Sequence, residues 1–235
     1  MQIITNSINF KSKNPTIKKA DKALRIIHSK FPVASPSKFA KFSTLKSSPQ
    51  YKSIVDRMAT IVTLIRMKIL PSEANDSPTV FYKKFLDTLN KHNIGNCGEL
   101  VKLVNFILGL NGIKAEKANL CPSSLNHCVS IIPLKENALN NIAFEITPLS
   151  KMKDILVVDP WLDIVDYAPN VATLFKNHPS YNKFLGNYKS AINYDDFIPC
   201  ENLYDIYLHP AIGSQHEVTE EVRAHFKATN PELFL

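Results

Sequence analysis

The apolar positions along the chain predict helices in the first half and strands after them. Apolar residues at helical spacing give expected helices at 18–30, Ser53–Leu70, Thr79–Lys91 and Cys97–Leu110. Pro71 is expected to end the second of these helices. The fourth is apolar almost all round, which is typical of a helix buried among other elements, and Asn111-Gly112 closes it.

Extended stretches dominate the next part of the chain. They are expected at Ile113–Leu120, Asn126–Pro133 and Asp154–Asp159, with a further candidate at Ile142–Thr147. Helices followed by strands, rather than alternating with them, predict an α+β fold with an antiparallel sheet. The last segment, from Glu217 onward, is expected to form a short helix followed by a free tail.

Composition places the chain among soluble globular proteins. With 45% hydrophobic and 21% charged residues, its 235 residues can bury a sizeable core. Four cysteines without a CxxC pair are too few for a disulfide framework, so free thiols and a reducing compartment are expected. The first residues contain no apolar signal-peptide core, and no uncharged stretch is long enough to span a bilayer.

Charge divides the chain near residue 76, where the run Pro71–Pro78 predicts a boundary. Residues 1–70 carry 14 Lys and Arg side chains against Asp21 and Asp56, a net charge of +12, whereas the rest of the chain carries −5. We therefore expect a basic helical N-terminal region, 1–76, and a mildly acidic domain, 77–235. The basic region suits an anionic membrane surface or an acidic partner, although a solvated lysine-rich surface is the simpler interpretation. No DNA-reading or RNA-reading motif accompanies it, so nucleic acid is not expected as a partner.

Cys97 is the first candidate for chemistry, because it starts the buried helix. A helix N-terminus favours an anion, which stabilises the thiolate and lowers the pKa of the thiol. Gly95 and Gly98 on either side allow close approach of backbone and substrate. The thiolate is the reactive form of cysteine, so this position suits a nucleophile, with an unreactive buried cysteine as the alternative.

His127 and Asp159 lie at the ends of two expected strands. By strand alternation His127 shares a face with Val129 and Ile131, and Asp159 follows four apolar residues directly before Pro160. If the two strands pair antiparallel, the start of one lies beside the end of the other. His127 and Asp159 then meet, the carboxylate can orient the imidazole, and the imidazole can deprotonate Cys97.

Four short runs together resemble a known family. They are Gly95-Asn96-Cys97-Gly98-Glu99, Gly112-Ile113, Asn126-His127-Cys128-Val129 and Val157-Val158-Asp159-Pro160-Trp161. These runs, within about residues 90–162, resemble the transglutaminase-like core of the papain-like superfamily of Cys-His-Asp enzymes. The resemblance implies that Cys97 is the nucleophile, His127 the general base and acid, and Asp159 the orienting acid, with no cofactor.

The resemblance also implies a setting. Small soluble members with divergent flanks include bacterial effectors that deamidate, cross-link or cleave host proteins. The acidic tail, which ends in Leu-Phe-Leu, is similar to tails of some type IV secreted effectors. These features imply secretion into the cytosol of a host cell without a Sec signal peptide.

The sequence departs from the family in two respects. Gly98 and Glu99 follow the cysteine where an aromatic residue is common, and the separation of His127 and Asp159 is longer than usual. A strand at Ile142–Thr147 directly between the other two would put Asp159 at the wrong end of the sheet. Glu145 is therefore the alternative third member of the triad.

Other side chains complete the expected site. The backbone N–H of Cys97 and the side chain of Asn93 or Asn96 are candidate oxyanion donors. Trp161 either lines the substrate site or caps the core. A zinc site is not expected, because adjacent His127 and Cys128 should point to opposite faces of a strand and the spacing to Cys121 matches no familiar site.

The expected activity is attack of a thiolate on a protein amide through a thioester intermediate. Deamidation or transglutamination of a glutamine side chain in a host protein is the leading hypothesis. A cysteine peptidase of papain-like fold is the alternative within chemistry. A binding module on the same scaffold, without catalysis, is the alternative from another class.

Overall fold

The structure is a computed structural model, and it describes residues 14–35, 50–121, 127–136, 138–139, 147–177, 207–210 and 216–235. The α-helices are α1 (Pro15–Lys30), α3 (Gln50–Asn75), α4 (Pro78–His92), α5 (Cys97–Leu110), α6 (Ala168–Asn177) and α8 (Glu220–Thr229). The strands are β1 (Glu116–Cys121), β2 (Cys128–Pro133), β3 (Ile155–Asp159), β4 (Ile164–Tyr167) and β5 (Tyr207–Pro210). Two short 3-10 helices are η2 (Leu149–Lys151) and η4 (Pro231–Leu233).

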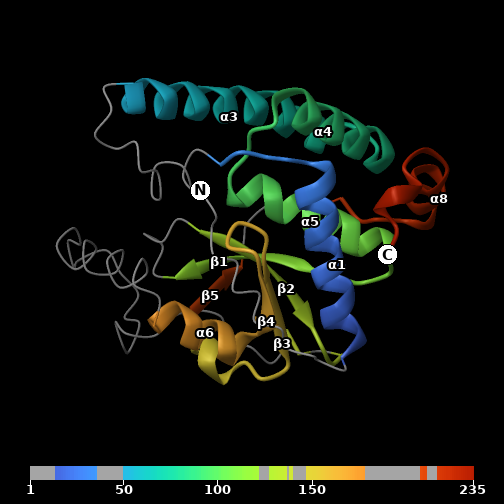
Figure 1. Ribbon diagram of the computed structural model, residues 1–235. Coiled ribbons are helices and arrows are strands. Elements are labelled where there is room, and N and C mark those ends of the chain that lie inside the picture. Colours follow the sequence, from blue (N-terminus) through green and yellow to red (C-terminus); the bar gives the residue numbers. More distant parts are fainter. Residues whose placement is uncertain are drawn as a thin grey trace.

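The strands form one antiparallel sheet in the order β4-β3-β2-β1-β5 (Figure 1). Strand β2 lies between β1 and β3, and its pairing with β3 sets Ser130 opposite Val158. The start of β2 therefore lies beside the end of β3. A helical first half followed by an antiparallel sheet confirms the predicted α+β class.

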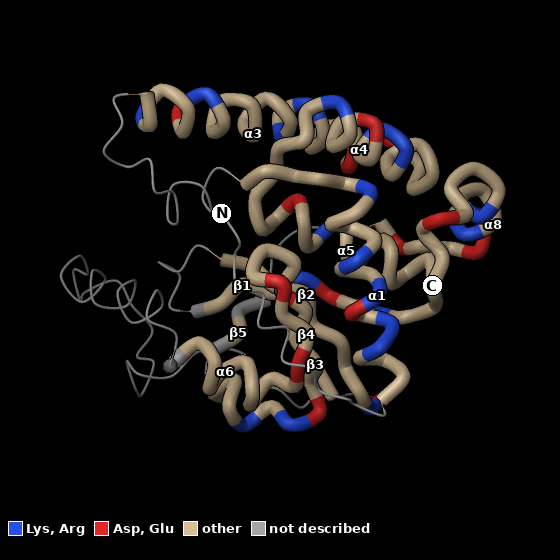
Figure 2. Tube along the Cα trace, in the orientation of Figure 1, with Lys and Arg blue, Asp and Glu red and all other residues tan. Residues whose placement is uncertain are grey.

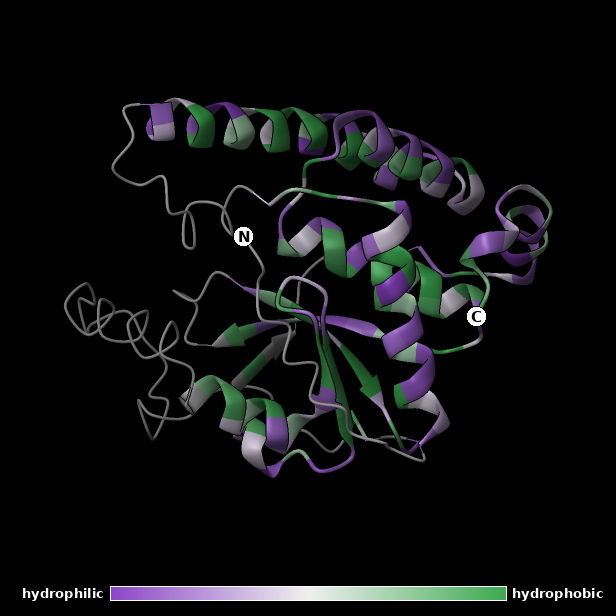
Figure 3. Ribbon diagram, viewed as in Figure 1, coloured by the Kyte–Doolittle hydropathy of each residue, from purple (hydrophilic) through white to green (hydrophobic). Residues whose placement is uncertain are grey.

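Helices cover both faces of the sheet, so two apolar cores form. Leu156 and Val158 point to the face covered by α1 and α5, whereas Ile155 and Val157 point to the face covered by α6. This alternation is the period of two that a strand buried on both sides requires. Figure 3 shows the green apolar stretches of the strands enclosed between these helices.

The helix α5 lies at the centre of the larger core and begins and ends at the predicted residues. Its apolar side chains are buried on all sides, as the sequence predicted. The one buried amide on it, Asn105, accepts a hydrogen bond from the hydroxyl of Ser130 on β2. Asn111 caps its C-terminus, and Gly112 follows with φ +73°, a conformation that glycine adopts without strain.

The first helix belongs to the same core as α5. Leu24 and Ile27 of α1 are buried against α5, and Figure 1 shows α1 lying across it. The helix starts at Pro15, three residues before the predicted start, because Asn14 accepts a hydrogen bond from the backbone N–H of Thr16 and Pro15 suits the first helical position. The predicted boundary near residue 76 falls between α3 and α4. The division into two regions stays a prediction.

Pro71 does not end α3, so that prediction was wrong. The helix continues to Asn75, with Pro71 inside it. Proline removes the hydrogen bond to the carbonyl of Met67, but both residues are exposed, so water can hydrate that carbonyl. The side chain of Asn75 then donates to the carbonyl of Pro71.

Several elements after Trp161 were not predicted. The strands β4 and β5 have four residues each, too few for a clear pattern of alternation, and β4 follows a turn in which Asp163 has φ +63°. The C-terminal tail is packed rather than free: Leu233 is buried, and Asn111 bonds to the backbone of both Leu233 and Leu235. Most of the candidate strand Ile142–Thr147 lies outside the described residues. Within the described ranges, no helix has the length and apolar character needed to cross a bilayer.

Candidate active site

Cys97 is the first residue of α5, and a local motif fixes where that helix starts. Asn96 is the N-cap, and its backbone N–H donates to the carboxylate of Glu99 at 2.9 Å. Gly95 precedes the cap, and a Cβ there would lie 3.1 Å from both Val33 and Glu99. A larger residue at position 95 would therefore crowd residues 31–35, which place Ala34 in a bridge with Ile94.

His127 and Asp159 meet as the antiparallel pairing of β2 and β3 predicts. His127 Nε2 lies 2.7 Å from Asp159 Oδ2, and the side chains are 6% and 0% exposed. The other carboxylate oxygen, Oδ1, accepts the backbone N–H groups of Trp161 at 2.9 Å and Leu162 at 3.0 Å. The turn that follows β3 thus orients the Asp159 carboxylate, and the carboxylate fixes the orientation of the His127 imidazole.

The charges of the cluster support each other. Burial alone lowers the pKa of His127, but the Asp159 carboxylate and the Cys97 thiolate outweigh it and raise the pKa to about 10. Hydrogen bonds from Cys128 and then from His127 lower the pKa of Cys97 to about 4, against the opposing effect of burial. These shifts favour a thiolate and an imidazolium at neutral pH. Because Asp159 bonds to Nε2, Nδ1 is the ring nitrogen left for the sulfur.

Cys128 is a member of the cluster that the sequence did not suggest. Its buried thiol donates to Cys97, and this hydrogen bond, together with burial and the charge of the neighbouring thiolate, raises the pKa of Cys128 itself. The prediction that His127 and Cys128 point apart was wrong, because both hydrogen-bond to Cys97. His127 lies one residue before β2, where strand alternation is not imposed.

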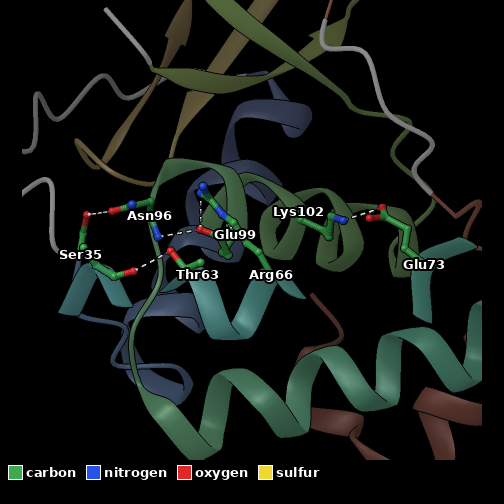
Figure 4. A network of polar contacts seen from close by, with 8 residues as sticks. Ser35, Thr63, Arg66, Glu73, Asn96, Glu99 and Lys102 are labelled. Atoms are coloured by element: carbon green, nitrogen blue, oxygen red, sulfur yellow. Dashed lines mark hydrogen bonds and ion pairs between the residues drawn. The ribbon is translucent and has the colours of Figure 1, made fainter. Parts of the chain in front are cut away.

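Trp161 is both a core residue and a neighbour of the imidazole. It is buried, its ring centroid lies 5.1 Å from that of His127, and its Nε1 donates to Ser35 Oγ at 2.8 Å. Ser35 Oγ in turn donates to Asn96 Oδ1 at 3.0 Å. Figure 4 shows the contact of Ser35 with Asn96. The segment before residue 36 thus links the turn after β3 to the N-terminus of α5.

The candidate oxyanion donors lie at the start of α5. The backbone N–H groups of Cys97 and Gly98 are in the first turn, where no helical carbonyl can accept from them. The side-chain oxygen of Asn96 is oriented by Ser35. Asn93 is exposed at the C-terminus of α4, and its carbonyl accepts from Ala34. The backbone groups are therefore the better candidates, and the role of either asparagine stays a prediction.

Two ion pairs attach α3 to α5 beside the cysteine. Arg66 donates to both oxygens of Glu99, at 2.7 and 3.2 Å, and Lys102 lies 2.5 Å from Glu73 (Figure 4). The hydrogen bond to Glu99 raises the pKa of Arg66, and the negative charge of Cys97 adds to this rise. Glu99 thus serves both as the cap of α5 and as the anchor of α3.

The structure leaves some sequence candidates unplaced. Glu145 and Cys200 lie outside the described residues, as does the side chain of Cys121. In the described part of the chain, no group of three His, Cys, Asp or Glu side chains is arranged to hold a metal ion.

The structure thus brings together Cys97, His127 and Asp159, the three residues that the sequence predicted to form a triad. Comparison of the chain with protein-family models, with curated proteins and with solved structures finds no match.

Proposed function

We propose that this protein is a cysteine-dependent acyltransferase or amide hydrolase of the transglutaminase-like type. The observation that carries the proposal is the charge-coupled cluster of Cys97, His127 and Asp159 at the start of α5. A buried aspartate on an imidazole that hydrogen-bonds to a thiolate at a helix N-terminus matches what thiol nucleophiles require. The sequence runs that resemble the transglutaminase-like core add support, and membership of the papain-like superfamily is part of the proposal.

The reaction follows from the protonation states. The Cys97 thiolate attacks the carbonyl carbon of an amide, and the N–H groups of Cys97 and Gly98 stabilise the oxyanion that forms. The His127 imidazolium then donates its proton to the departing nitrogen, which leaves a thioester on Cys97. Neutral His127 next removes a proton from water or an amine, which cleaves the thioester and restores the thiolate.

The proposed substrate is a glutamine side chain of a protein in the cytosol of a host cell. Water as the second nucleophile gives deamidation, and an amine gives cross-linking. A reducing compartment fits the site, because Cys97 and Cys128 are both unoxidised and hydrogen-bonded to each other, and an oxidising compartment favours their disulfide. A main-chain amide as target would make the protein a peptidase instead.

The test uses lysine-blocked casein as the glutamine donor, with and without a fluorescent primary amine. Ammonia release without the amine and dye incorporation with it support acyl transfer, provided that both vanish in Cys97→Ala. New N-termini without ammonia release support the peptidase. If casein and a glutamine peptide library both yield no ammonia, no dye incorporation and no new N-termini, the proposal is contradicted.

A second candidate function is docking on a membrane through α3. The exposed face of this helix favours such docking. Leu64 and Met67 are 58% and 68% exposed, and Arg57 and Lys68 are exposed on the same side of the helix. Figure 2 shows the basic residues along α3. Apolar side chains among cations suit an anionic membrane surface, to which this face would attach the protein. Such docking is compatible with catalysis and also with a non-catalytic binding module.

A further inference from the structure

Two cationic side chains from different elements converge beside Cys97. The next residue, Gly98, has no side chain, and a Cβ at that position would lie 3.8 Å from Arg66 Nη2 and 3.9 Å from Lys117 Nζ. The sulfur of Cys128 is 4.0 Å from the same point. The space next to the nucleophile is therefore bordered by a guanidinium from α3, an ammonium from β1 and a thiol from β2.

Lys117 is held in this position by the register of the sheet. It pairs with Ser130, whose hydroxyl bonds to Asn105, so this face of the sheet points to α5. Asn119, two residues later, pairs with Cys128 on the same face. The part of β1 that faces the start of α5 is thus polar, although β1 has buried apolar residues on its other face.

The two cations differ in how their charge is balanced. Arg66 is paired with Glu99 through two hydrogen bonds. Among the residues that the structure describes, Lys117 forms no ion pair, and it is only partly exposed. Its charge acts on the thiols, since it opposes the rise in the pKa of Cys128. When Cys97 becomes acylated, the negative charge of its thiolate disappears from this space, and the positive charges of Lys117 and Arg66 remain beside it.

We propose that Lys117, with Arg66 beside it, forms a subsite for a carboxylate of the substrate next to the attacked amide. The inference rests on the proposed function and adds a specificity: glutamines flanked by Asp or Glu are preferred over those flanked by neutral residues. A substrate carboxylate supplies a negative charge beside Lys117 after acylation, and it is attracted to the site before the reaction.

The test uses two reagents that carry the same leaving group but different charge. The thiolate displaces iodide from iodoacetate, which is anionic, and from iodoacetamide, which is neutral. Both react with the same thiolate, so the ratio of the two rates at Cys97 does not depend on the pKa of Cys97. We expect Lys117→Gln to lower the iodoacetate-to-iodoacetamide ratio about three- to tenfold, with a further drop in Lys117→Glu.

Lys114→Gln is the matched control, because Lys114 is exposed just before β1 and its loss changes the net charge equally. Its ratio should equal that of the unmodified protein, and added salt should reduce the ratio in both. Fast alkylation of Cys97 with the same ratio in Lys117→Gln and in Lys114→Gln overturns the subsite alone. Slow alkylation of Cys97 by both reagents in the unmodified protein overturns the proposed function and the subsite with it.

Discussion

His127 Nε2 and Asp159 Oδ2 lie 2.7 Å apart in a part of the molecule from which water is almost wholly excluded. A buried carboxylate is costly unless its oxygens are bonded, and those of Asp159 accept from His127, Trp161 and Leu162. The arrangement stabilises the protonated imidazole. It therefore links the fold of the β2–β3 pair to the ionisation of Cys97.

Asp159→Asn should remove the charge but keep the fold. The amide oxygen still accepts from the backbone after β3, so unfolding should change little, whereas the pKa of His127 should fall. We expect alkylation of Cys97 by iodoacetamide at pH 6 to slow at least about tenfold. The control is Asp154→Asn at an exposed ion pair with Lys135, which should leave the rate unchanged. An unchanged rate in Asp159→Asn would show that the carboxylate does not activate the thiol.

The rate of Cys97 alkylation should depend on pH in a particular direction. A lowered pKa of about 4 means that the thiolate persists above that pH and is lost as the pH falls through it. The rate should thus be flat from about pH 5 to 9. Replacement by His127→Ala removes the imidazolium, so the inflection should move upward. An inflection near that of an ordinary thiol in the unmodified protein would contradict the ion pair.

Turnover should be bell-shaped in pH, because it needs the imidazolium as well as the thiolate. A raised pKa of about 10 means that His127 keeps its proton until the pH rises through that value. The measurement is kcat/KM for amine incorporation between pH 3 and 11, which reports the free enzyme. A profile that rises only above pH 8 would exclude a thiolate–imidazolium resting state.

Cys128 should act as a hydrogen-bond donor to the nucleophile. Cys128→Ala removes the donor and should raise the pKa of Cys97, whereas Cys128→Ser keeps a donor of similar size and should raise it less. The difference is read from the pH dependence of Cys97 alkylation in the two variants. Identical profiles for Ala and Ser would mean that Cys128 only fills space.

Arg66→Gln should destabilise the protein by leaving Glu99 without its partner. Glu99 has a side chain that is 10% exposed, whereas Arg66 is 48% exposed, so the expected cost is about 1–2 kcal/mol in the free energy of unfolding. Urea unfolding measures it, with exposed Arg57→Gln as the control. A cost no larger than that of Arg57→Gln would mean that this ion pair does not hold α3 on α5.

Docking of α3 on membranes predicts binding to anionic vesicles that weakens with salt. Leu64→Glu together with Met67→Glu should abolish sedimentation with vesicles of phosphatidylserine and phosphatidylcholine, because the two carboxylates replace apolar side chains and repel the anionic surface. Both side chains are exposed, so the fold should be kept. The protein should not sediment with phosphatidylcholine alone. No binding to anionic vesicles at low salt removes this candidate function.

The sequence predicted the parts of the fold that local patterns determine. The bounds of α5 follow from its apolar run, with Cys97 after the cap and Gly112 after the end. The contact of His127 with Asp159 followed from antiparallel pairing, which places the start of one strand beside the end of the other. These inferences needed only residues that are close in sequence or strands that are neighbours in the sheet.

The remainder depends on tertiary packing that no local pattern encodes. Pro71 was expected to break α3, but exposure of the affected carbonyl makes it tolerable there. The contacts of Arg66 and Lys117 beside Gly98 depend on how α3 and β1 pack around α5. Cys128 was judged by strand alternation, which does not determine how two side chains at the end of a sheet approach a third.

Activation of Cys97 is tested most directly by its alkylation rate at pH 6, resolved from that of the other three cysteines by peptide mass spectrometry. We expect Cys97 to react at least about a hundredfold faster than Cys121, Cys128 or Cys200, and His127→Ala to abolish the difference. Equal, slow labelling of all four cysteines in the unmodified protein would contradict an activated nucleophile at the start of α5.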